Sequence, residues 1–356
     1  MNSFLTVAAL FVLTGALFAL PLLPAVRELR RKSDASPLNV IQKHAGEIRY
    51  FADSFRTYLR PLEPLLRECA RSGQKASGVM PDGTEYLVLG SGNEALALPF
   101  GDKDRLCPVL LASASDLTVS PDSAFTRDIY AQGRFVGGPN NQYRAVLADY
   151  EVHLGKGSRV MRWVHAGGEL SVESHSKLHG RASSDFRIRL RPGCSFLRLN
   201  APRIEFGTSP SEAPTPNFNV APISSSPTLT RLLHEGDFEI PSGETFQGDL
   251  VVRGRLRIGS GAQVRGSVKS GKAMILDSGV RIEGSLISAA KLLIGPDCLI
   301  QGPVISEHEL LIQTGTHCGT PHAPTTVSAP RIKIAGGVVA FGSVWARDHG
   351  EVLGSA

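Results

Sequence analysis

The most regular feature of the chain is a recurrence of apolar residues and glycines at intervals of 18 positions in its C-terminal part. Within each unit, apolar residues alternate at positions i and i+2, and a turn rich in Gly, Pro, Ser or Asp then interrupts them. This pattern predicts short strands joined by tight corners. Two positions define the repeat, and we expect both to belong to its core: Ile240, Ile258, Leu276 and Ile294, and Gly248, Gly266, Gly284 and Gly302.

A weaker copy of the same template precedes this region. Its leading apolar positions lie 18, 17, 18 and 18 residues apart, at Leu117, Phe135, Val152, Leu170 and Ile188. Both copies reach their sixth unit through the same four residues, Ala-Pro-Arg-Ile, at 201–204 and 329–332. We therefore expect a duplication of one six-unit block.

Physical chemistry dictates how such units fold. Residues one repeat apart can lie above one another at the ~4.8 Å spacing of paired strands, so each strand pairs with its copy in the next coil. A single coil buries too few aliphatic side chains to offset the entropy lost on ordering its backbone, so coils fold only against one another. The sequence predicts an all-β fold, a parallel β-helix (β-solenoid) with 18 residues per coil and about eleven or twelve coils. The pattern leaves open whether the two halves form one rod.

The N-terminus carries a different pattern. Residues 4–23 are 20 positions without a charge, which at ~1.5 Å per residue is enough for a helix to cross a ~30 Å hydrocarbon layer. Four basic residues follow, and the positive-inside rule places that flank and the rest of the chain in the cytoplasm: Arg27, Arg30, Arg31 and Lys32. A secretory signal peptide is the alternative, with Ala16 and Ala19 as a near-match to a cleavage site, but signal peptides carry their positive charge before the apolar core. We predict a single-pass anchor.

After the anchor, apolar residues recur with helical spacing up to Leu62, and Pro61 and Pro64 are expected to end that helix. Its arginines could contact anionic lipid headgroups, or the helix could pack on the domain that follows. The expected organisation has seven parts: a transmembrane anchor with its basic flank (1–32), a juxtamembrane amphipathic helix (33–72), a connecting segment or capping coil (73–115), a first β-helical half (116–206), a Pro/Ser-rich linker or excursion (207–232), a second β-helical half (233–346) and a C-terminal tail (347–356).

Composition narrows the function. The 38 basic and 33 acidic side chains of the 356 residues give a net charge of +5 without a dense Lys/Arg block, which argues against nucleic-acid binding. Five scattered cysteines without a C-x-x-C pair argue against a disulfide framework or a zinc site, so we expect no metal. The G-x-G-x-x-A match at 90–95 lacks the following helix that a dinucleotide site requires, so we expect no cofactor.

The second half resembles the bactofilins, the polymer-forming cytoskeletal proteins of bacteria. The resemblance rests on repeated units such as Leu256-Arg257-Ile258 followed by Val264-Arg265-Gly266-Ser267-Val268. It implies a β-helix that assembles end to end into nucleotide-free filaments under the inner membrane and organises cell-envelope or cell-shape machinery. The partners it implies are further copies of the chain, the inner membrane and cell-envelope proteins, and it implies no catalysis.

Two alternatives remain. A monomeric solenoid could act as an interaction platform for a partner protein. A left-handed β-helix acyltransferase also has coils of three times six residues, but it needs a histidine base, for which His308, His317 and His322 are the candidates.

For the scaffold, an uncapped solenoid end offers unpaired backbone groups and apolar edges to the next subunit. We expect that end to be the last coil, at Val338, Val339, Phe341, Val344 and Trp345.

Overall fold

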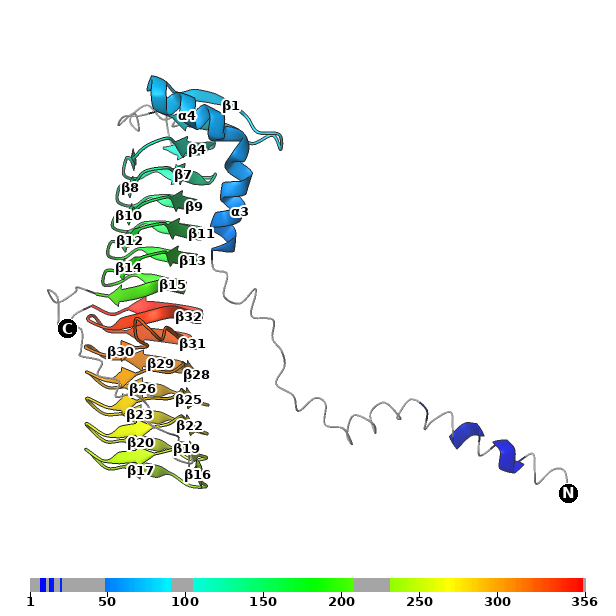
Figure 1. The fold of residues 1–356 in the computed structure, drawn as a ribbon, viewed down its shortest axis with the longest axis vertical. Helices are drawn as coiled ribbons and strands as arrows, with labels where there is room; N and C mark the ends of the chain where they lie inside the picture. The colour runs from blue at the N-terminus through cyan, green and yellow to red at the C-terminus, as the bar shows by residue number, and fades with distance from the viewer. Residues whose placement is uncertain are drawn as a thin grey trace. The chain divides into compact units, whose positions relative to one another are not determined.

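A computed structural model describes residues 7–10, 13–15, 20, 49–90, 105–207 and 231–354. Parallel pairing between strands roughly 18 residues apart builds a solenoid of about 12 turns, which confirms the predicted parallel β-helix. Figure 1 shows the turns stacked on one another, with the first block of repeats above and the second below. The 32 strands of the described residues belong to one hydrogen-bonded sheet system, so the two blocks form one continuous stack.

Each turn contributes strands to three walls, which we name A, B and C. In the second block, wall A contains β16, β19, β22, β25, β28 and the first part of β31, and wall B contains β17, β20, β23, β26, β29 and the second part of β31. Wall C contains β18, β21, β24, β27, β30 and the start of β32, whose middle continues wall A and whose end continues wall B. The bounds are β16 Arg231–His234, β17 Phe238–Ile240, β18 Thr245–Gln247, β19 Asp249–Val252, β20 Leu256–Ile258, β21 Gln263–Arg265, β22 Val268–Ser270, β23 Met274–Leu276, β24 Arg281–Ile282, β25 Leu286–Ser288, β26 Leu292–Ile294, β27 Leu299–Ile300, β28 Val304–Ser306, β29 Glu309–Ile312, β30 His317–Cys318, β31 Thr325–Ile334 and β32 Val339–Val352.

The first block repeats this arrangement. Wall A contains β2, β4, β7, the last parts of β9, β11 and β13 and the central part of β15, and the first residues of these four long strands belong to wall C together with β3 and β6. Wall B contains β5, β8, β10, β12, β14 and the end of β15. The bounds are β1 Ala76–Val79, β2 Glu85–Leu89, β3 Leu106–Cys107, β4 Leu110–Ser113, β5 Leu117–Val119, β6 Ala124–Phe125, β7 Ile129–Ala131, β8 Phe135–Gly137, β9 Gln142–Ala148, β10 Val152–Leu154, β11 Arg159–Ala166, β12 Glu169–Val172, β13 Lys177–Ser184, β14 Arg187–Leu190 and β15 Ser195–Phe206.

The repeat positions lie in register through the second block. Ile240 pairs with Ile258, Ile258 with Leu276 and Leu276 with Ile294, and all four side chains are buried. The Ala-Pro-Arg-Ile segments both place their isoleucine in wall B, since Ile204 pairs with Ile188 and Ile332 with Leu310, but β32 adds one more strand to wall B after Ile332. The interior is therefore a column of stacked aliphatic residues, and the 18-residue period corresponds to one turn of the solenoid.

The recurring glycine also has a packing reason. A Cβ atom on Gly284 would lie 2.5 Å from the carbonyl carbon and oxygen of Gly266, and a Cβ on Gly302 would lie 2.5 Å from the same atoms of Gly284. Real Cβ atoms do not approach backbone that closely, so a side chain at this corner would push neighbouring coils apart. Glycine is required here because coil stacks on coil with backbone in contact.

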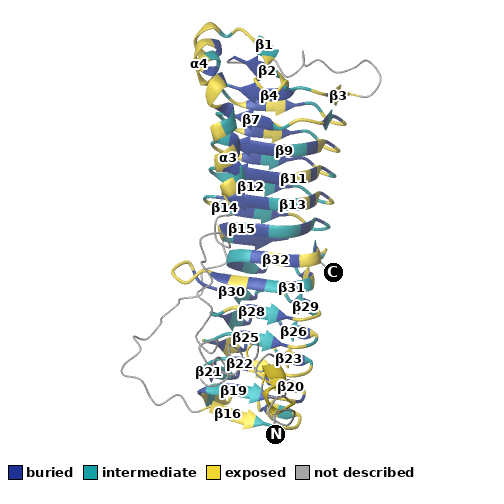
Figure 2. Ribbon diagram, turned by 90° about the vertical axis from the view of Figure 1, so that its right-hand side faces the viewer, coloured by how far each residue is buried: buried dark blue, intermediate teal, exposed yellow. Residues whose placement is uncertain are grey.

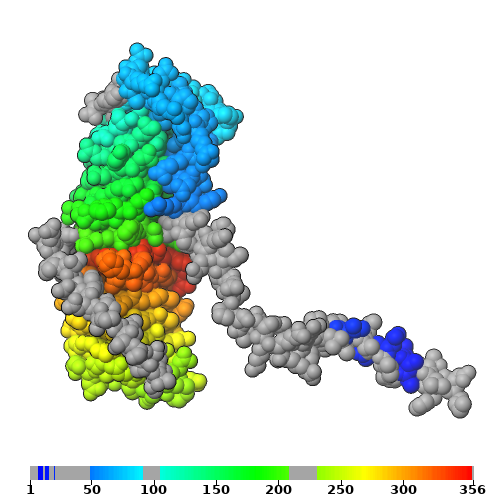
Figure 3. Space-filling view, viewed as in Figure 1, coloured from blue at the N-terminus to red at the C-terminus, as the bar shows by residue number. Residues whose placement is uncertain are grey.

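The segment before the solenoid is helical and packs on it. It consists of α3 (Tyr50–Leu59), the 3-10 turn η3 (Arg60–Leu62) and α4 (Glu63–Ser72). As expected, α3 ends before Pro61, and Pro61 and Pro64 lie at the starts of η3 and α4, where a missing backbone N–H costs nothing. Ala52, Phe55 and Leu59 of α3 are buried, and Figure 3 shows the helix lying along the coils of the first block.

Wall A of the first block is therefore buried on both of its faces. Its inner face belongs to the solenoid core, while outward-facing Ala145, Leu147 and Trp163 pack with Phe55 and Leu59 of α3 in a second apolar cluster. The burial colours in Figure 2 show this as strands that are dark along their length. Strands buried on two faces read as continuous apolar runs rather than alternating ones, which accounts for the weaker repeat of this half.

Two sequence-based boundaries can be compared with the structure. β32 runs past the predicted limit at residue 346 to Val352, so 347–352 belong to the last coil and not to a tail. Residues 73–90 form the hairpin β1–β2, whose second strand joins β4.

Three predictions concern residues outside the described ranges in whole or large part: the anchor at 4–23, the G-x-G-x-x-A match at 90–95 and the linker at 207–232. Within the part of the chain that the structure describes, no helix combines the length and apolar character that a membrane span requires.

Candidate functional site

The five residues predicted to form a polymerisation contact lie in β32 or directly before it, in the middle of the stack (Figures 1 and 2). β32 pairs antiparallel with β15, the last strand of the first block. The register joins Val339 to Glu205, Val344 to Leu199 and Trp345 to Arg198. The assignment of this coil as a free docking end is therefore corrected, because its backbone groups are already paired within the chain. Of the set, Val338, Phe341 and Val344 are buried, Val339 is half-buried and Trp345 is exposed.

Side chains reinforce this junction. The Asn200 amide donates hydrogen bonds to Oγ of Ser343 at 2.9 Å and to the carbonyl oxygen of Gly342 at 3.3 Å. The guanidinium of Arg198 lies 5.2 Å from the ring centroid of Trp345. A Cβ on Gly350 would collide with the ring of Phe196, which packs across the junction.

The junction has an approximate two-fold character. The wall A residues of β15 pair with the wall A residues of β32, whereas wall B of one block meets wall C of the other on either side. Crossed pairing of this kind is what a dyad through wall A produces. The two blocks thus meet tail to tail, and each presents its head, meaning its first coil, at an opposite end of the stack.

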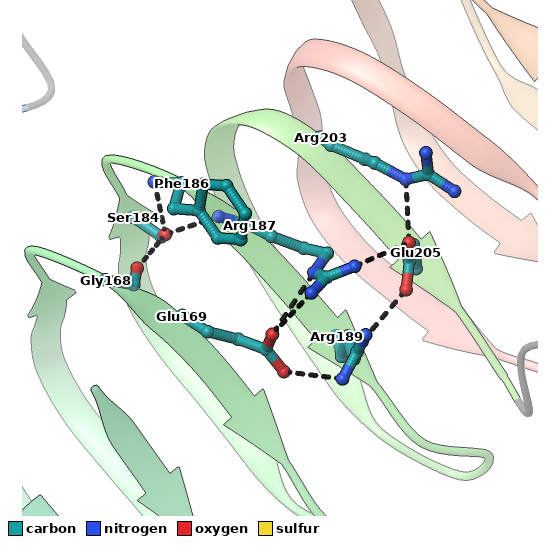
Figure 4. A network of polar contacts seen from close by, with 8 residues as sticks. All are labelled: Gly168, Glu169, Ser184, Phe186, Arg187, Arg189, Arg203 and Glu205. Carbon is teal, nitrogen blue, oxygen red and sulfur yellow. Dashed lines mark hydrogen bonds and ion pairs between the residues drawn. The ribbon is translucent and has the colours of Figure 1, made fainter.

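A network of ion pairs lies on the outer face of wall B beside the junction (Figure 4). Glu169 of β12 accepts from Arg187 at 2.9 Å and from Arg189 at 2.9 Å. Glu205 of β15 accepts from Arg189 at 3.0 Å and from Arg203 at 2.7 Å. Burial alone would raise the pKa of Glu205, but the three guanidiniums outweigh it and hold the pKa below its usual range. The network links three successive coils, and its carboxylates and guanidiniums largely neutralise one another.

Polar contacts also hold α3 against wall A. Arg56 pairs with Asp149 at 3.0 Å, and the Tyr130 hydroxyl donates to the same carboxylate at 2.6 Å. At the helix start, Arg49 pairs with Asp185 at 2.6 Å. The arginines expected at lipid headgroups thus include two that bind the solenoid, which supports the packing alternative for this helix.

A serine, a histidine and an aspartate meet beneath this helix start. Nδ1 of His165 lies 2.9 Å from Oγ of Ser183, and Nε2 lies 3.8 Å from Oδ1 of Asp185. The residue types are those of a hydrolytic triad, but a nucleophile must reach its substrate. Ser183 is only 5% exposed and His165 only 1% exposed. Burial lowers the pKa of His165, so the neutral imidazole is the form suited to this contact.

The other candidate groups are dispersed. All five cysteines are free and buried, and burial raises the pKa of Cys194 and Cys298 to about 11 and of Cys318 to about 12. Nδ1 of His317 lies 3.1 Å from the carbonyl oxygen of Gly315. No cluster of three or more His, Cys, Asp or Glu side chains suited to a metal ion occurs within 49–90, 105–207 and 231–354 or the short described N-terminal pieces.

The two heads of the stack differ. At the first head, wall A continues into β2, which carries β1 on its far edge and contacts α4. Both ribbon views show α4 and β1 beyond β4 (Figures 1 and 2). At the second head, each of the strands β16, β17 and β18 pairs with one strand among the described residues, namely the strand of the next coil. The other edge of each strand faces away from the stack.

Sequence reasoning missed this second head and the junction. The available signal for the head was the apolar pair Leu232-Leu233 before the first clear repeat. The structure leaves 37% and 53% of these two residues exposed. Comparison of the chain with protein-family models, with curated proteins and with solved structures found no match.

Proposed function

We propose that this chain is a membrane-anchored structural scaffold of the bactofilin kind, which works without nucleotide and without catalysis. The observation that carries the proposal is the uninterrupted stack of about 12 turns, whose interior is a column of buried aliphatic side chains. Such a body is stiff, because every coil is hydrogen-bonded to its neighbours along three walls. Stiffness and regular outer faces suit a protein that holds other molecules at fixed positions.

Membrane attachment is the second element of the proposal. The uncharged stretch at 4–23 and the basic flank that follows it have the length and charge order of a single-pass anchor with a cytoplasmic C-terminal side. The chain then enters α3, which is held to the solenoid by Phe55, Arg56 and Arg49. A tether that ends in a clamped helix would keep the solenoid close to the inner membrane and available to cell-envelope proteins.

A monomeric interaction platform is the second candidate function. It is favoured by the occupied junction, because the coil expected to recruit the next subunit already binds β15 of the same chain. The two candidates differ in whether the chain associates with itself, and share the tether and the rigid body.

Fractionation of bacterial cells that express the chain with a C-terminal tag tests the tether. We expect the full chain to remain in the membrane pellet after washing with high salt and with alkaline carbonate, and a variant lacking residues 1–32 to move to the soluble fraction. Replacement of Arg27, Arg30, Arg31 and Lys32 by Gln is the matched control, because it keeps the apolar segment and removes the charges. That control should stay in the pellet, but the C-terminal side should lie in the cytoplasm in a smaller fraction of the molecules.

Protease treatment of spheroplasts reports the orientation. A cytoplasmic C-terminal tag is protected until the membrane is lysed. Recovery of the intact full chain in the soluble fraction would refute the anchor, and digestion of the tag in unlysed spheroplasts would refute the cytoplasmic placement.

A further inference from the structure

The second head of the stack exposes residues that elsewhere belong to the core. Leu232 of β16 occupies the inward position of Leu250, which is fully buried, yet 37% of Leu232 is exposed. Phe238 and Phe246 stand likewise in line with the buried Leu256 and Val264, and both remain partly accessible. Apolar side chains above unpaired strand edges form a surface suited to association.

The chain closes wall A at two other places by the same device. At the first head, β1 pairs antiparallel with β2, and at the junction β32 pairs antiparallel with β15. The junction joins the tails of the two blocks, and it shows that end strands of wall A can pair antiparallel with each other. Among the described residues, β16 is the end strand of wall A that lacks such a partner.

We propose that the second head binds the second head of another copy of this chain, giving a two-fold dimer. The proposal rests on the scaffold function above and names its self-association surface. By analogy with the junction, β16 pairs antiparallel with β16 of the second copy, and β17 of each copy meets β18 of the other. Each edge strand thereby gains a neighbour.

Side-chain direction and charge select the register. Leu232 and His234 point inward and Leu233 points outward, because they pair with Leu250, Val252 and Val251. Antiparallel partners must point to the same side, so the dyad falls on a residue of β16. A dyad at Leu233 also brings Arg231 towards Glu235 of the second copy, which follows the end of β16 and pairs with Arg253 of its own chain at 3.2 Å, so opposite charges meet at both rims.

The association stops at two copies. The first head carries β1 and α4, which are absent from the second head. The end strands of both tails are already paired with each other at the junction. A contact that uses the same patch on both partners closes on itself and leaves no further head of the same kind. The outcome is a discrete double-length solenoid rather than a filament built through coil ends.

A cysteine placed at the dyad tests this geometry in the full chain, solubilised in mild detergent. In Leu233→Cys, the two thiols would face each other across an antiparallel pair with Cα atoms about 5 Å apart, within disulfide reach. Lys269→Cys is the matched control: it lies on the same wall, is exposed, and follows Leu233 by two coils in register. Its thiols would be about 24 Å apart in the dimer, four strand spacings more. The five native cysteines are buried and compete little.

Mild oxidation should give a reducible covalent dimer of Leu233→Cys, about tenfold more abundant than that of Lys269→Cys. Sedimentation of the unmodified chain should give twice the 38.0 kDa mass of one chain. Arg231→Glu and Glu235→Arg should each weaken the dimer by placing like charges together, and the double exchange should restore it. Equal cross-linking at both positions, a monomeric mass, or a ladder of larger species would each overturn the proposal.

These results separate the dimer from the scaffold proposal. A membrane-bound chain that sediments as a monomer would overturn only the dimer, and would also be the result if another segment of the chain covered the second head. A dimer that fails to bind membranes would overturn the tether alone.

Discussion

The stacked glycine corner gives the sharpest prediction about the solenoid itself. Gly284 has no positive φ, so an alanine there is not strained by its own backbone. Its Cβ would nevertheless lie 2.5 Å from the carbonyl carbon and oxygen of Gly266 and 2.6 Å from the amide nitrogen of Ser267. An ordinary contact needs about 3.4 Å or more, so the two coils must separate by nearly 1 Å at this corner or tilt against each other.

The magnitude follows from what the separation disturbs. Overpacking of an ordered interior costs about 1–3 kcal/mol. The neighbouring ladder bond from the Gly284 amide to the Gly266 carbonyl, now 3.0 Å long, lies at the corner that must open. We therefore expect Gly284→Ala to lower the free energy of unfolding by about 2–3 kcal/mol, and to weaken hydrogen-exchange protection first in β22 and β25 beside it.

Gly236→Ala is the matched control. It also lacks a positive φ, but its Cβ would meet only the His234 imidazole at 3.5 Å, which is an ordinary contact. We expect it to change stability by less than about 0.5 kcal/mol. Urea unfolding followed by circular dichroism compares the two variants with the wild type. Equal unfolding midpoints for both variants would refute the reasoning, because neighbouring coils could then move apart to accommodate a methyl group without loss of stability.

Two polar contacts lead to further predictions. Glu205→Gln removes the buried charge that accepts hydrogen bonds from Arg189 and Arg203, and we expect a loss of about 1.5–3 kcal/mol in urea unfolding at neutral pH. A midpoint equal to that of the wild type would show that the arginines find other acceptors. Burial lowers the pKa of His165, so below about pH 6.5 the unfolded chain binds a proton that the folded chain resists, and stability falls as the pH drops towards the folded pKa. His165→Gln should flatten that fall when unfolding is measured between about pH 7 and 5, whereas an unchanged slope would assign it to other groups such as His317, whose pKa burial also lowers.

The second block was predictable because one physical constraint repeats in it. Each coil must place an aliphatic residue inward at the same corner and a glycine where backbones touch, so the 18-residue period is visible without any partner information. In the first block the outer face of wall A is covered by α3, and residues such as Ala145 and Trp163 are buried and apolar on this outer face as well. Because outward residues are apolar too, the alternation of apolar and polar residues is weaker in this block, while the interval between repeats is unchanged.

The junction could not be predicted in the same way. The last stretch of β32 alternates charged outward residues with Gly350 and Val352, and its Arg347, Asp348 and His349 read as a solvated tail. Its strand character comes from β15 and β31, which lie on either side of it. Pairing between residues as far apart in sequence as Glu205 and Val339 leaves no local period, and Gly350 is explained only by the Phe196 ring that occupies its space.

A duplication of this kind constrains how the chain can end. Each block has a head and a tail whose edge strands need a partner or a cover. Fusing two blocks tail to tail satisfies both tails at once, and β1 with α4 supplies a cover that is specific to the first head because it is built from residues that precede only that block. The second head follows the linker instead, and its exposed Leu232 and Leu233 are unusual for a strand meant to stay alone. The asymmetry of the two heads therefore favours a chain that pairs once through β16, and with the tether proposed above such a pair would carry two anchors on one rigid double-length body.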